Sequence, residues 1–126
     1  MVVGIGVDIV SVEQFKKAFA GKPRRLQKVF CEREIADAGT GVRKWERLAA
    51  RFAAKEAVMK SIGKGIFQVP FHDIRVERAE NGKPSVHLSG KAFELARSMR
   101  VDRVLISLSH QKSYAVAYAT AMREGL

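Results

Sequence analysis

The segment that predicts the fold spans residues 51–65 and reads Arg51-Phe52-Ala53-Ala54-Lys55-Glu56-Ala57-Val58-Met59-Lys60-Ser61-Ile62-Gly63-Lys64-Gly65. It is typical of the last turns of a helix that begins near Arg43, because glycines commonly follow the end of a helix. At about 100° per residue, the helix has one narrow apolar stripe. The stripe consists of Leu48, Phe52, Met59 and Ile62. A long, partly buried helix is therefore expected at the centre of the fold.

Glu56 lies beside this stripe, and Lys60 follows one turn later. A carboxylate at the edge of a buried face is costly unless it is paired, and a solvated glutamate is expected on the opposite side, near Ala50 and Ala54. One interpretation is an ordinary helical ion pair between Glu56 and Lys60, which contributes only about 0.2 to 0.5 kcal/mol. The other is that Glu56 holds a ligand. This segment alone favours the ion pair.

Length and composition predict a single domain, residues 1–126, with a hydrophobic core. The only cysteine, Cys31, excludes an internal disulfide and a cysteine-based zinc site. Segment 1–10 is apolar but contains Asp8 and no basic leader, so neither a signal peptide nor a membrane span is predicted, and a cytoplasmic location is expected. The net charge of +10 predicts a polyanionic partner: nucleic acid, an anionic membrane, a phosphate-rich cofactor or an acidic protein.

The positive charge gathers in two segments. The first contains Lys16, Lys17, Lys22, Arg24, Arg25 and Lys28. The second contains Arg43, Lys44, Arg47 and Arg51. Two basic patches indicate two anionic contacts, and the alternative is a pair of solvated helix faces.

The N-terminal residues Met1–Ile9 predict a buried strand whose side chains alternate between two faces. One face carries Val3, Ile5, Val7 and Ile9. The other carries Gly4, Gly6 and Asp8. Glycines that alternate along a strand indicate that another backbone or a ligand approaches closely. Asp8 is therefore expected at the end of a shallow trough.

The remaining chain predicts an α+β fold, with the long central helix packed on a mostly antiparallel sheet. Ser11 is a candidate N-cap for a helix with Phe15, Ala18 and Phe19 inward, and one or two short helices are expected between Arg24 and Gly39. A further helix begins at Ser89 or Gly90. Its core candidates are Phe93, Leu95, Ala96 and Met99.

The expected strands include a hairpin around Asn81-Gly82, which is the strongest short hairpin signal in the chain. Two closing strands span Val104–His110 and Tyr114–Ala121. His110 ends an apolar row of alternate residues on the first of them. A lone histidine in such a place is more often structural than functional.

Asp8 and Glu56 stand out as carboxylates placed against small or apolar faces. Without clustered histidines or cysteines they do not predict a zinc site. Two carboxylates suit Mg²⁺, which prefers oxygen ligands and often binds substrate phosphates as well. Lys60 could then neutralise a phosphate oxygen. The residues therefore suggest magnesium-assisted chemistry on a phosphate ester or anhydride.

Two long motifs stand out along the chain. They are Gly4-Ile5-Gly6-Val7-Asp8-Ile9-Val10 and Arg51-Phe52-Ala53-Ala54-Lys55-Glu56-Ala57, which continues to Lys60 and Gly63-Lys64-Gly65-Ile66. Together they resemble the two signature motifs of the 4'-phosphopantetheinyl transferases. Two further motifs are Asn81-Gly82-Lys83-Pro84 and Ser107-Leu108-Ser109-His110-x-x-x-Tyr114-Ala115-Val116-Ala117. With the one-domain length, these two resemble the holo-acyl-carrier-protein synthase family specifically, and the resemblance covers nearly the whole chain in the expected order.

The resemblance implies transfer of the 4'-phosphopantetheine group of coenzyme A to a serine of an apo acyl carrier protein, with release of adenosine 3',5'-bisphosphate. Asp8 and Glu56 would bind Mg²⁺, and Lys60 would contact the phosphate. The serine proton would pass to Glu56, to a metal-bound water or to a carboxylate of the carrier. Whether the carrier serves fatty acid or polyketide synthesis stays open.

The resemblance also assigns the remaining coenzyme A contacts. Arg51 and His110 match positions near the nucleotide end of coenzyme A, at its 3'-phosphate, and Gly63 belongs to a glycine segment that leaves room for pantetheine or pyrophosphate. Family members of this length assemble as homotrimers with coenzyme A sites between subunits. No nucleic acid or membrane partner is implied.

The acidic carrier is expected to contact the segment from Gln14 to Arg25. Gln14 departs from the family pattern, which often has an arginine there, and a neutral amide cannot form that charge-assisted pair. Lys64 is a milder departure, at a position where a small hydroxylic residue is common. The alternative function is a small basic nucleic-acid-binding protein, although Phe15 and Phe19 are spaced as a buried helix face and not as a stacking platform.

Overall fold

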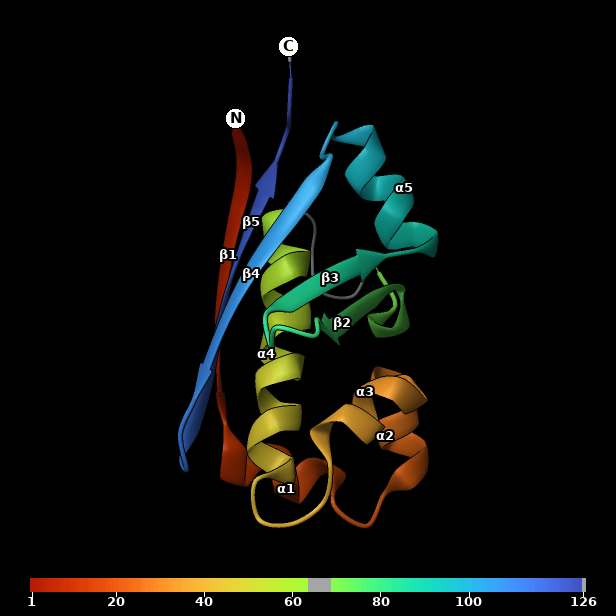
Figure 1. Cartoon of the computed structure of the whole chain (residues 1–126). Helices are drawn as coiled ribbons and strands as arrows, with labels where there is room; N and C mark the ends of the chain where they lie inside the picture. The colour runs from red at the N-terminus through yellow and green to blue at the C-terminus, as the bar shows by residue number, and fades with distance from the viewer. Residues whose placement is uncertain (64–68, 126) are drawn as a thin grey trace.

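The computed structural model describes residues 1–63 and 69–125 and shows an α+β fold built around helix α4 (Figure 1). The helix packs along one face of a three-stranded antiparallel sheet with the order β1-β5-β4. These four elements are α4 (Lys44–Ser61), β1 (Val2–Ser11), β5 (Tyr114–Met122) and β4 (Arg103–His110). The expected fold class is confirmed, and the central helix begins within one residue of its predicted start.

The other elements surround α4 away from this sheet. Helices α1, α2 and α3 gather at the N-terminal end of α4, and α5 lies toward its other end (Figure 1). A short antiparallel hairpin, β2-β3, follows the 3-10 turn η2. Their bounds are α1 (Val12–Phe19), α2 (Pro23–Val29), α3 (Glu32–Ala38), η2 (Phe71–Asp73), β2 (Ile74–Arg78), β3 (Pro84–Leu88) and α5 (Gly90–Ser98).

Local sequence signals account for several boundaries. The hydroxyl of Ser11 accepts a hydrogen bond from the backbone N–H of Gln14, which confirms the predicted N-cap of α1. Gly82 has a φ of +82° in the turn between β2 and β3, a conformation that a residue without Cβ adopts at low cost. Helix α5 begins after Ser89. The backbone N–H groups of Lys91 and Ala92, in its first turn, donate hydrogen bonds to the carboxylate of Asp73. A side chain from η2 therefore caps a helix that follows later in the chain.

Helix α4 is buried on almost every side, and the expected solvated side near Ala50 and Ala54 is therefore wrong. Both alanines are buried because the sheet covers one side of α4, while α1, α3 and β2 cover others. Alanine lets a helix approach its neighbours closely without a loss of helix propensity. Within the predicted apolar stripe, Leu48, Met59 and Ile62 are buried and Phe52 is partly buried.

The apolar face of β1 is the outer face of the sheet, which corrects the expectation that the strand is buried. Ile5, Val7 and Ile9 are 59%, 55% and 67% exposed, respectively. The glycine face points at α4 instead. Alternation identified the two faces correctly from Gly4 onward, but hydrophobicity indicated the wrong one as the inner face. Val3 departs from the predicted alternation because the register shifts between Val2 and Gly4, and Val3 packs against the core.

Helix α5 also differs from expectation at one position, since Phe93 is half-exposed while Ala96 is buried in the core.

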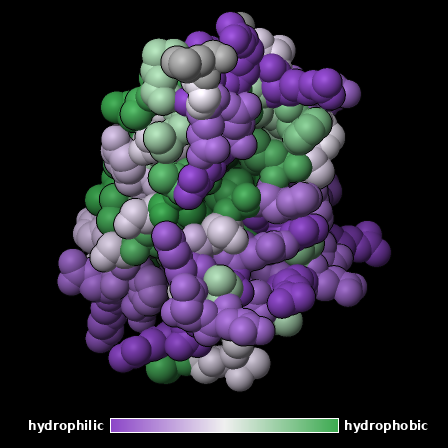
Figure 2. Space-filling view, turned by 45° about the horizontal axis from the view of Figure 1, so that its top comes forward, coloured by the Kyte–Doolittle hydropathy of each residue, from purple (hydrophilic) through white to green (hydrophobic). Residues whose placement is uncertain are grey.

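Hydrophilic residues cover most of the face seen in Figure 2, and hydrophobic residues gather in its upper half. A predominantly hydrophilic face agrees with a chain of net charge +10. Within residues 1–63 and 69–125, no helix is both long enough and apolar enough to cross a membrane.

Candidate functional site

Asp8 reaches the edge of α4 because the two preceding glycines on its face have no side chain. A Cβ atom on Gly4 would lie 2.0 Å from the carbonyl oxygen of Ser61, and one on Gly6 would lie 1.9 Å from that of Ala57. Real Cβ atoms do not approach so closely, so a larger residue would push strand and helix apart. The predicted close approach is confirmed, and the approaching group is the backbone of α4.

Lys60 joins Asp8 from the last turn of α4. Its Nζ atom lies 3.3 Å from Oδ1 of Asp8 and donates a hydrogen bond to the carbonyl oxygen of Val7 at 3.0 Å. In the part of the chain that the structure describes, Lys60 makes no ion pair with Glu56, so the expected helical pair is wrong. The nearby strand offers Lys60 both a carboxylate and a carbonyl oxygen.

Glu56 lies close enough to both groups to be affected by their charges. Partial burial and, to a smaller extent, the negative charge of Asp8 raise the pKa of Glu56 to about 7, against the opposing effect of the positive charge of Lys60. A carboxyl group with such a pKa is partly protonated at neutral pH. It can therefore take up or release a proton under physiological conditions.

These carboxylates line a shallow depression of about 340 Å³ between β1, α1 and α4. Its other lining residues include Gln14 and the aromatic side chains of Phe15, Phe19 and Phe52. Gln14 therefore belongs to the rim of the carboxylate site as well as to α1. We call this region the carboxylate depression.

The carboxylate depression has a donor set suited to Mg²⁺. Asp8 and Glu56 provide oxygen ligands, and their mutual repulsion, which contributes to the raised pKa of Glu56, would be relieved by a cation. Within the described residues, no group of three or more His, Cys, Asp and Glu side chains is arranged to hold a metal ion. Two protein carboxylates fit an ion that completes its coordination with water and substrate oxygens.

Arg51 and His110 line a second recess, about 170 Å³ in volume, between α4, the β2-β3 hairpin and the end of β4. Other residues that line it include Arg47, Arg78 and Pro84. We call it the arginine recess. Three arginines and one glutamate, Glu77, line its walls, so it suits an anion.

Arg51 is held in this recess with part of its hydrogen-bonding capacity unused. Its side chain is only 8% exposed, and Nη1 donates to the carbonyl oxygen of Arg47 at 3.3 Å. Among the described residues, no acceptor lies within hydrogen-bond distance of its buried Nε. Burial lowers the pKa of Arg51. A buried guanidinium with a free donor can bind an anionic ligand strongly.

One chain does not bring all the predicted site residues together. Asp8 belongs to β1 and His110 to β4, which are the two outer strands of the β1-β5-β4 sheet. The carboxylate depression and the arginine recess share no lining residue. Gly63 follows the end of α4, with a φ of +81°, and lines neither of them. The predicted roles of Lys64 and Gly65 lie outside the described residues.

The sequence pattern of the 4'-phosphopantetheinyl transferase superfamily matches residues 4–119, which include the carboxylate depression and the arginine recess. The chain belongs to this superfamily. Holo-[acyl-carrier-protein] synthase of Clostridium novyi is 39% identical over 119 residues, covering 94% of this chain and 86% of the relative. The synthase of Moorella thermoacetica is 40% identical over 114 residues, covering 90% and 89%, respectively.

Solved structures of superfamily members have the same fold. The holo-(acyl-carrier-protein) synthase from Bacillus anthracis, in complex with CoA (3',5'-ADP), has a TM-score of 0.81 and 34% identity, covering 98% of this chain and 99% of the other. The holo-ACP-synthase from Plasmodium yoelii has a TM-score of 0.85 and 30% identity, covering 99% and 98%. Because both chains are covered almost completely, the likeness extends over the whole transferase fold.

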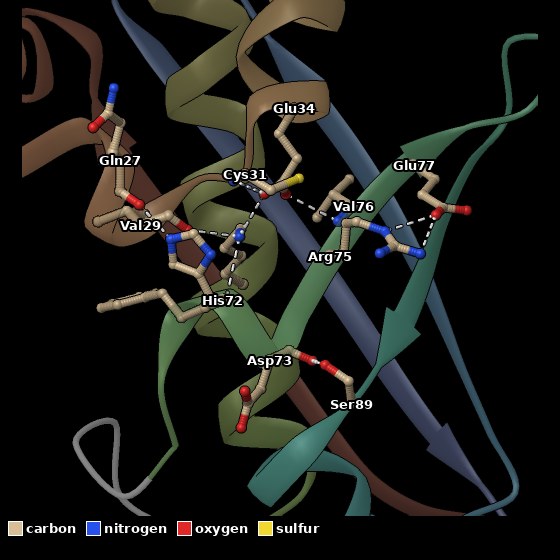
Figure 3. A network of polar contacts seen from close by, with 12 residues as sticks. Gln27, Val29, Cys31, Glu34, His72, Asp73, Arg75, Val76, Glu77 and Ser89 are labelled. Carbon is tan, nitrogen blue, oxygen red and sulfur yellow. Dashed lines mark hydrogen bonds and ion pairs between the residues drawn. The ribbon is translucent and has the colours of Figure 1, made fainter. Parts of the chain in front are cut away.

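Sequence reasoning missed a buried ion pair beside the site, between Lys55 and Glu34. Nζ of Lys55 lies 2.9 Å from Oε1 of Glu34 and also donates to the carbonyl oxygens of Val29 and Phe71. Figure 3 shows Glu34 pointing toward the backbone of Cys31 and β2, and its carboxylate accepts hydrogen bonds from the N–H groups of Cys31 and Val76. Burial lowers the pKa of Lys55, and the charge of Glu34 opposes this shift. The pair fixes α3, α4 and β2 to one another.

Proposed function

We propose that the protein, as a single transferase domain over residues 1–126, transfers the 4'-phosphopantetheine group of coenzyme A to a serine of an apo acyl carrier protein in the cytoplasm. The observation that carries this proposal is the placement of Asp8, Glu56 and Lys60 at one edge of α4 in a chain of this superfamily. The reaction forms a bond between the serine oxygen and the phosphorus that bears pantetheine. It breaks the pyrophosphate bond and releases adenosine 3',5'-bisphosphate.

Asp8 and Glu56 are the residues that would hold Mg²⁺. When bound, the ion would neutralise charge on the pyrophosphate of coenzyme A. The ammonium group of Lys60 lies beside Asp8 and is partly exposed, so it can bind a phosphate oxygen as negative charge develops. The pKa of about 7 belongs to Glu56 without a bound cation, and Mg²⁺ would lower it, so the serine proton could pass to Glu56, to a water molecule or to a carboxylate of the carrier.

Arg51 and His110 would bind the nucleotide end of coenzyme A at its 3'-phosphate. The unpartnered Nε of Arg51 and the positive walls of the arginine recess support this assignment. A phosphate there would accept hydrogen bonds from a guanidinium that is already held in place. The synthases from Bacillus anthracis and Helicobacter pylori have been solved as complexes with CoA (3',5'-ADP) and coenzyme A, respectively.

We further propose that the active form is a homotrimer with the coenzyme A site between subunits. Two observations support this proposal. The carboxylate depression and the arginine recess belong to opposite edges of the sheet, so one subunit could supply the first and its neighbour the second. The outer sheet face also leaves apolar side chains in contact with water, which association would bury. They include Ile5, Val7, Ile9, Val116 and Tyr118.

The acidic carrier would contact the segment from Gln14 to Arg25. Gln14 is exposed and lines the carboxylate depression, so this segment leads directly to the proposed reaction centre. Lys16 and Lys17 lie in the last turn of α1. Their positive charges complement an acidic partner and can speed its association.

The decisive experiment combines the purified protein, an apo carrier, coenzyme A and Mg²⁺. We expect the carrier mass to increase by one phosphopantetheine and adenosine 3',5'-bisphosphate to appear in equal amount. A matched reaction with chelator should show neither product. Salt-dependent DNA binding without coenzyme A binding by calorimetry would contradict the proposal and favour the nucleic-acid alternative.

A further inference from the structure

A side-chain contact that the proposed chemistry does not use joins Glu46 to His110. Oε1 of Glu46 lies 3.1 Å from Nδ1 of His110, although the two residues are 64 positions apart in the chain. Glu46 belongs to the first turn of α4, and His110 is the last residue of β4. Their side chains are 17% and 33% exposed, respectively, so the contact lies at the surface with Glu46 the more buried partner.

Glu46 contacts the imidazole of His110 although several arginine and lysine side chains lie nearby. Arg43 and Lys112 lie with Glu46 and His110 around a shallow surface depression. On the other side of His110, the arginine recess contributes the titratable or charged groups of Arg47, Arg51, Glu77 and Arg78. Within residues 1–63 and 69–125, Glu46 makes no ion pair with any arginine or lysine. The carboxylate is placed against the imidazole although many cations are nearby.

His110 forms part of the wall between these two regions, while Glu46 lines only the outer one. Since a carboxylate is an acceptor, Nδ1 must carry the proton in this hydrogen bond. Nε2 then remains as the ring nitrogen available to a ligand, and it donates to an anion when the ring carries both protons. When one ring nitrogen of a histidine faces a ligand, a carboxylate that accepts a hydrogen bond from the other nitrogen commonly fixes the tautomer and the orientation of the ring.

We propose that Glu46 is a positioning residue: its carboxylate accepts the hydrogen bond from Nδ1–H of His110 and directs Nε2 toward the 3'-phosphate of coenzyme A, to which the protonated ring donates from Nε2–H. This inference rests on the proposed function, because it assigns that phosphate to the arginine recess. Glu46 acts through His110 and does not touch the ligand. Its removal should therefore weaken coenzyme A binding without slowing the transfer step.

The kinetic test compares coenzyme A with 3'-dephospho-coenzyme A at saturating apo carrier. For coenzyme A, His110→Ala should raise KM about 10-fold or more, and Glu46→Leu should raise it about 3- to 10-fold with kcat unchanged. Glu46→Gln keeps an acceptor oxygen and should stay close to wild type. With 3'-dephospho-coenzyme A, the Glu46 variants should match the wild type. Glu94→Leu, which removes an exposed carboxylate of α5, is the control for net charge.

A double-mutant cycle separates positioning from a general structural effect. If Glu46 acts through His110, adding Glu46→Leu to His110→Ala should change KM for coenzyme A little further. Additive effects would overturn the proposal, as would equal losses with the two substrates. Wild-type transfer to the carrier is measured alongside, so a failure of the proposed function itself would be visible as no transfer by any variant.

The first half of the proposal is also tested without any ligand. Long-range ¹H–¹⁵N NMR spectra of the neutral imidazole should show His110 as the Nδ1–H tautomer in the wild type. In Glu46→Leu the signal should move toward the Nε2–H tautomer that free histidine favours. A wild-type ring already in the Nε2–H form would overturn the proposal, whatever the transfer assay shows.

Discussion

The carboxylate depression and the arginine recess lie on either side of the same helix, but they are built in different ways. Two like-charged carboxylates, Asp8 and Glu56, line the depression, and Lys60 pairs with Asp8 next to it. In the recess, positive charges predominate, and the buried Nε of Arg51 has no acceptor among the described residues. The first region is suited to changing its charge state during chemistry, and the second to binding a fixed anion.

The comparison shows how one helix can support two functions. Arg51 and Glu56 are five positions apart on α4, which places them on different sides of the helix. Helix α4 carries Glu56 toward β1 and Arg51 toward the β2-β3 hairpin. If a single coenzyme A molecule uses both regions, neighbouring copies of the chain could combine them, as the proposed homotrimer implies. Variants in the two regions should consequently differ in kind, with losses of kcat in the first and increases of KM in the second.

The largest expected effect is at Asp8. Asp8→Ala removes one of the two carboxylates that would hold Mg²⁺, and metal-ion stabilisation is worth several kcal/mol, so kcat/KM for carrier modification should fall about 1,000-fold. Mass spectrometry of the carrier at timed intervals measures the loss. Glu94→Ala serves as the control for removal of an exposed carboxylate. Transfer at the wild-type rate by Asp8→Ala would remove the metal assignment.

The pH dependence of folding should show the unusual state of Glu56. Its pKa rises from 4.5 to about 7 in the folded protein, so the folded state binds this proton more tightly than the unfolded chain does. The raised pKa therefore stabilises the folded state fully at pH values below the unfolded pKa, and this contribution to the free energy of unfolding is lost as the pH rises through about 7. With solvent screening, the loss between pH 5 and 8 should be about 1 to 3 kcal/mol.

The measurement compares urea unfolding of the wild type and Glu56→Gln with metal ions chelated. The glutamine variant lacks the titrating group, so the difference between the two proteins isolates Glu56. We expect the wild type to lose stability relative to the variant as pH increases. An unchanged difference from pH 5 to pH 8 would show that Glu56 titrates normally in the metal-free protein and would contradict the raised pKa.

Arg51→Ala should produce a smaller effect of the other kind. Loss of a charge-assisted hydrogen bond to phosphate should raise KM for coenzyme A about 10- to 100-fold, with kcat close to wild type. Circular dichroism is needed as a folding control because Arg51 is buried. A fall in kcat with unchanged KM would place Arg51 in the chemistry and would remove the contrast between the two regions.

The smallest expected effect is at Gln14. Gln14→Arg adds an exposed positive charge at the rim of the carboxylate depression, so KM for an acidic apo carrier should fall about 2- to 5-fold, and less at high salt. Several carriers should be compared under steady-state conditions. Gln27→Arg, a matched change on α2 outside the segment from Gln14 to Arg25, should have little effect. Equal responses to both substitutions would indicate a general charge effect.

Sequence patterns predicted much of the fold because most of its signals are local. The hairpin turn at Asn81-Gly82, the Ser11 cap and the end of α4 near Gly63 each depend on a few neighbouring residues. The glycines of β1 also predicted a close backbone approach. They could not show that the apolar face of β1 turns outward, because hydrophobicity alone does not distinguish a core from a surface that other copies could cover.

Parts of the site depend on contacts between distant segments, which spacing cannot reveal. Lys55 and Lys60 are both lysines on one helix, yet the first pairs with buried Glu34 and the second with Asp8. The Glu46–His110 contact joins the beginning of α4 to the end of β4. The two carboxylates were found from sequence because each lies next to a regular pattern of glycine or apolar residues.

The bare glycine face of β1 has a consequence for how accurately the reaction centre is built. Because Gly4 and Gly6 leave no side chain between β1 and α4, the separation of Asp8 from Glu56 depends on main-chain contact and not on adjustable packing. The scaffold of the site is in this sense preorganised, and little reorganisation is needed before a ligand binds. Engineering of this enzyme should therefore treat β1 and α4 as one rigid body and vary specificity from α1.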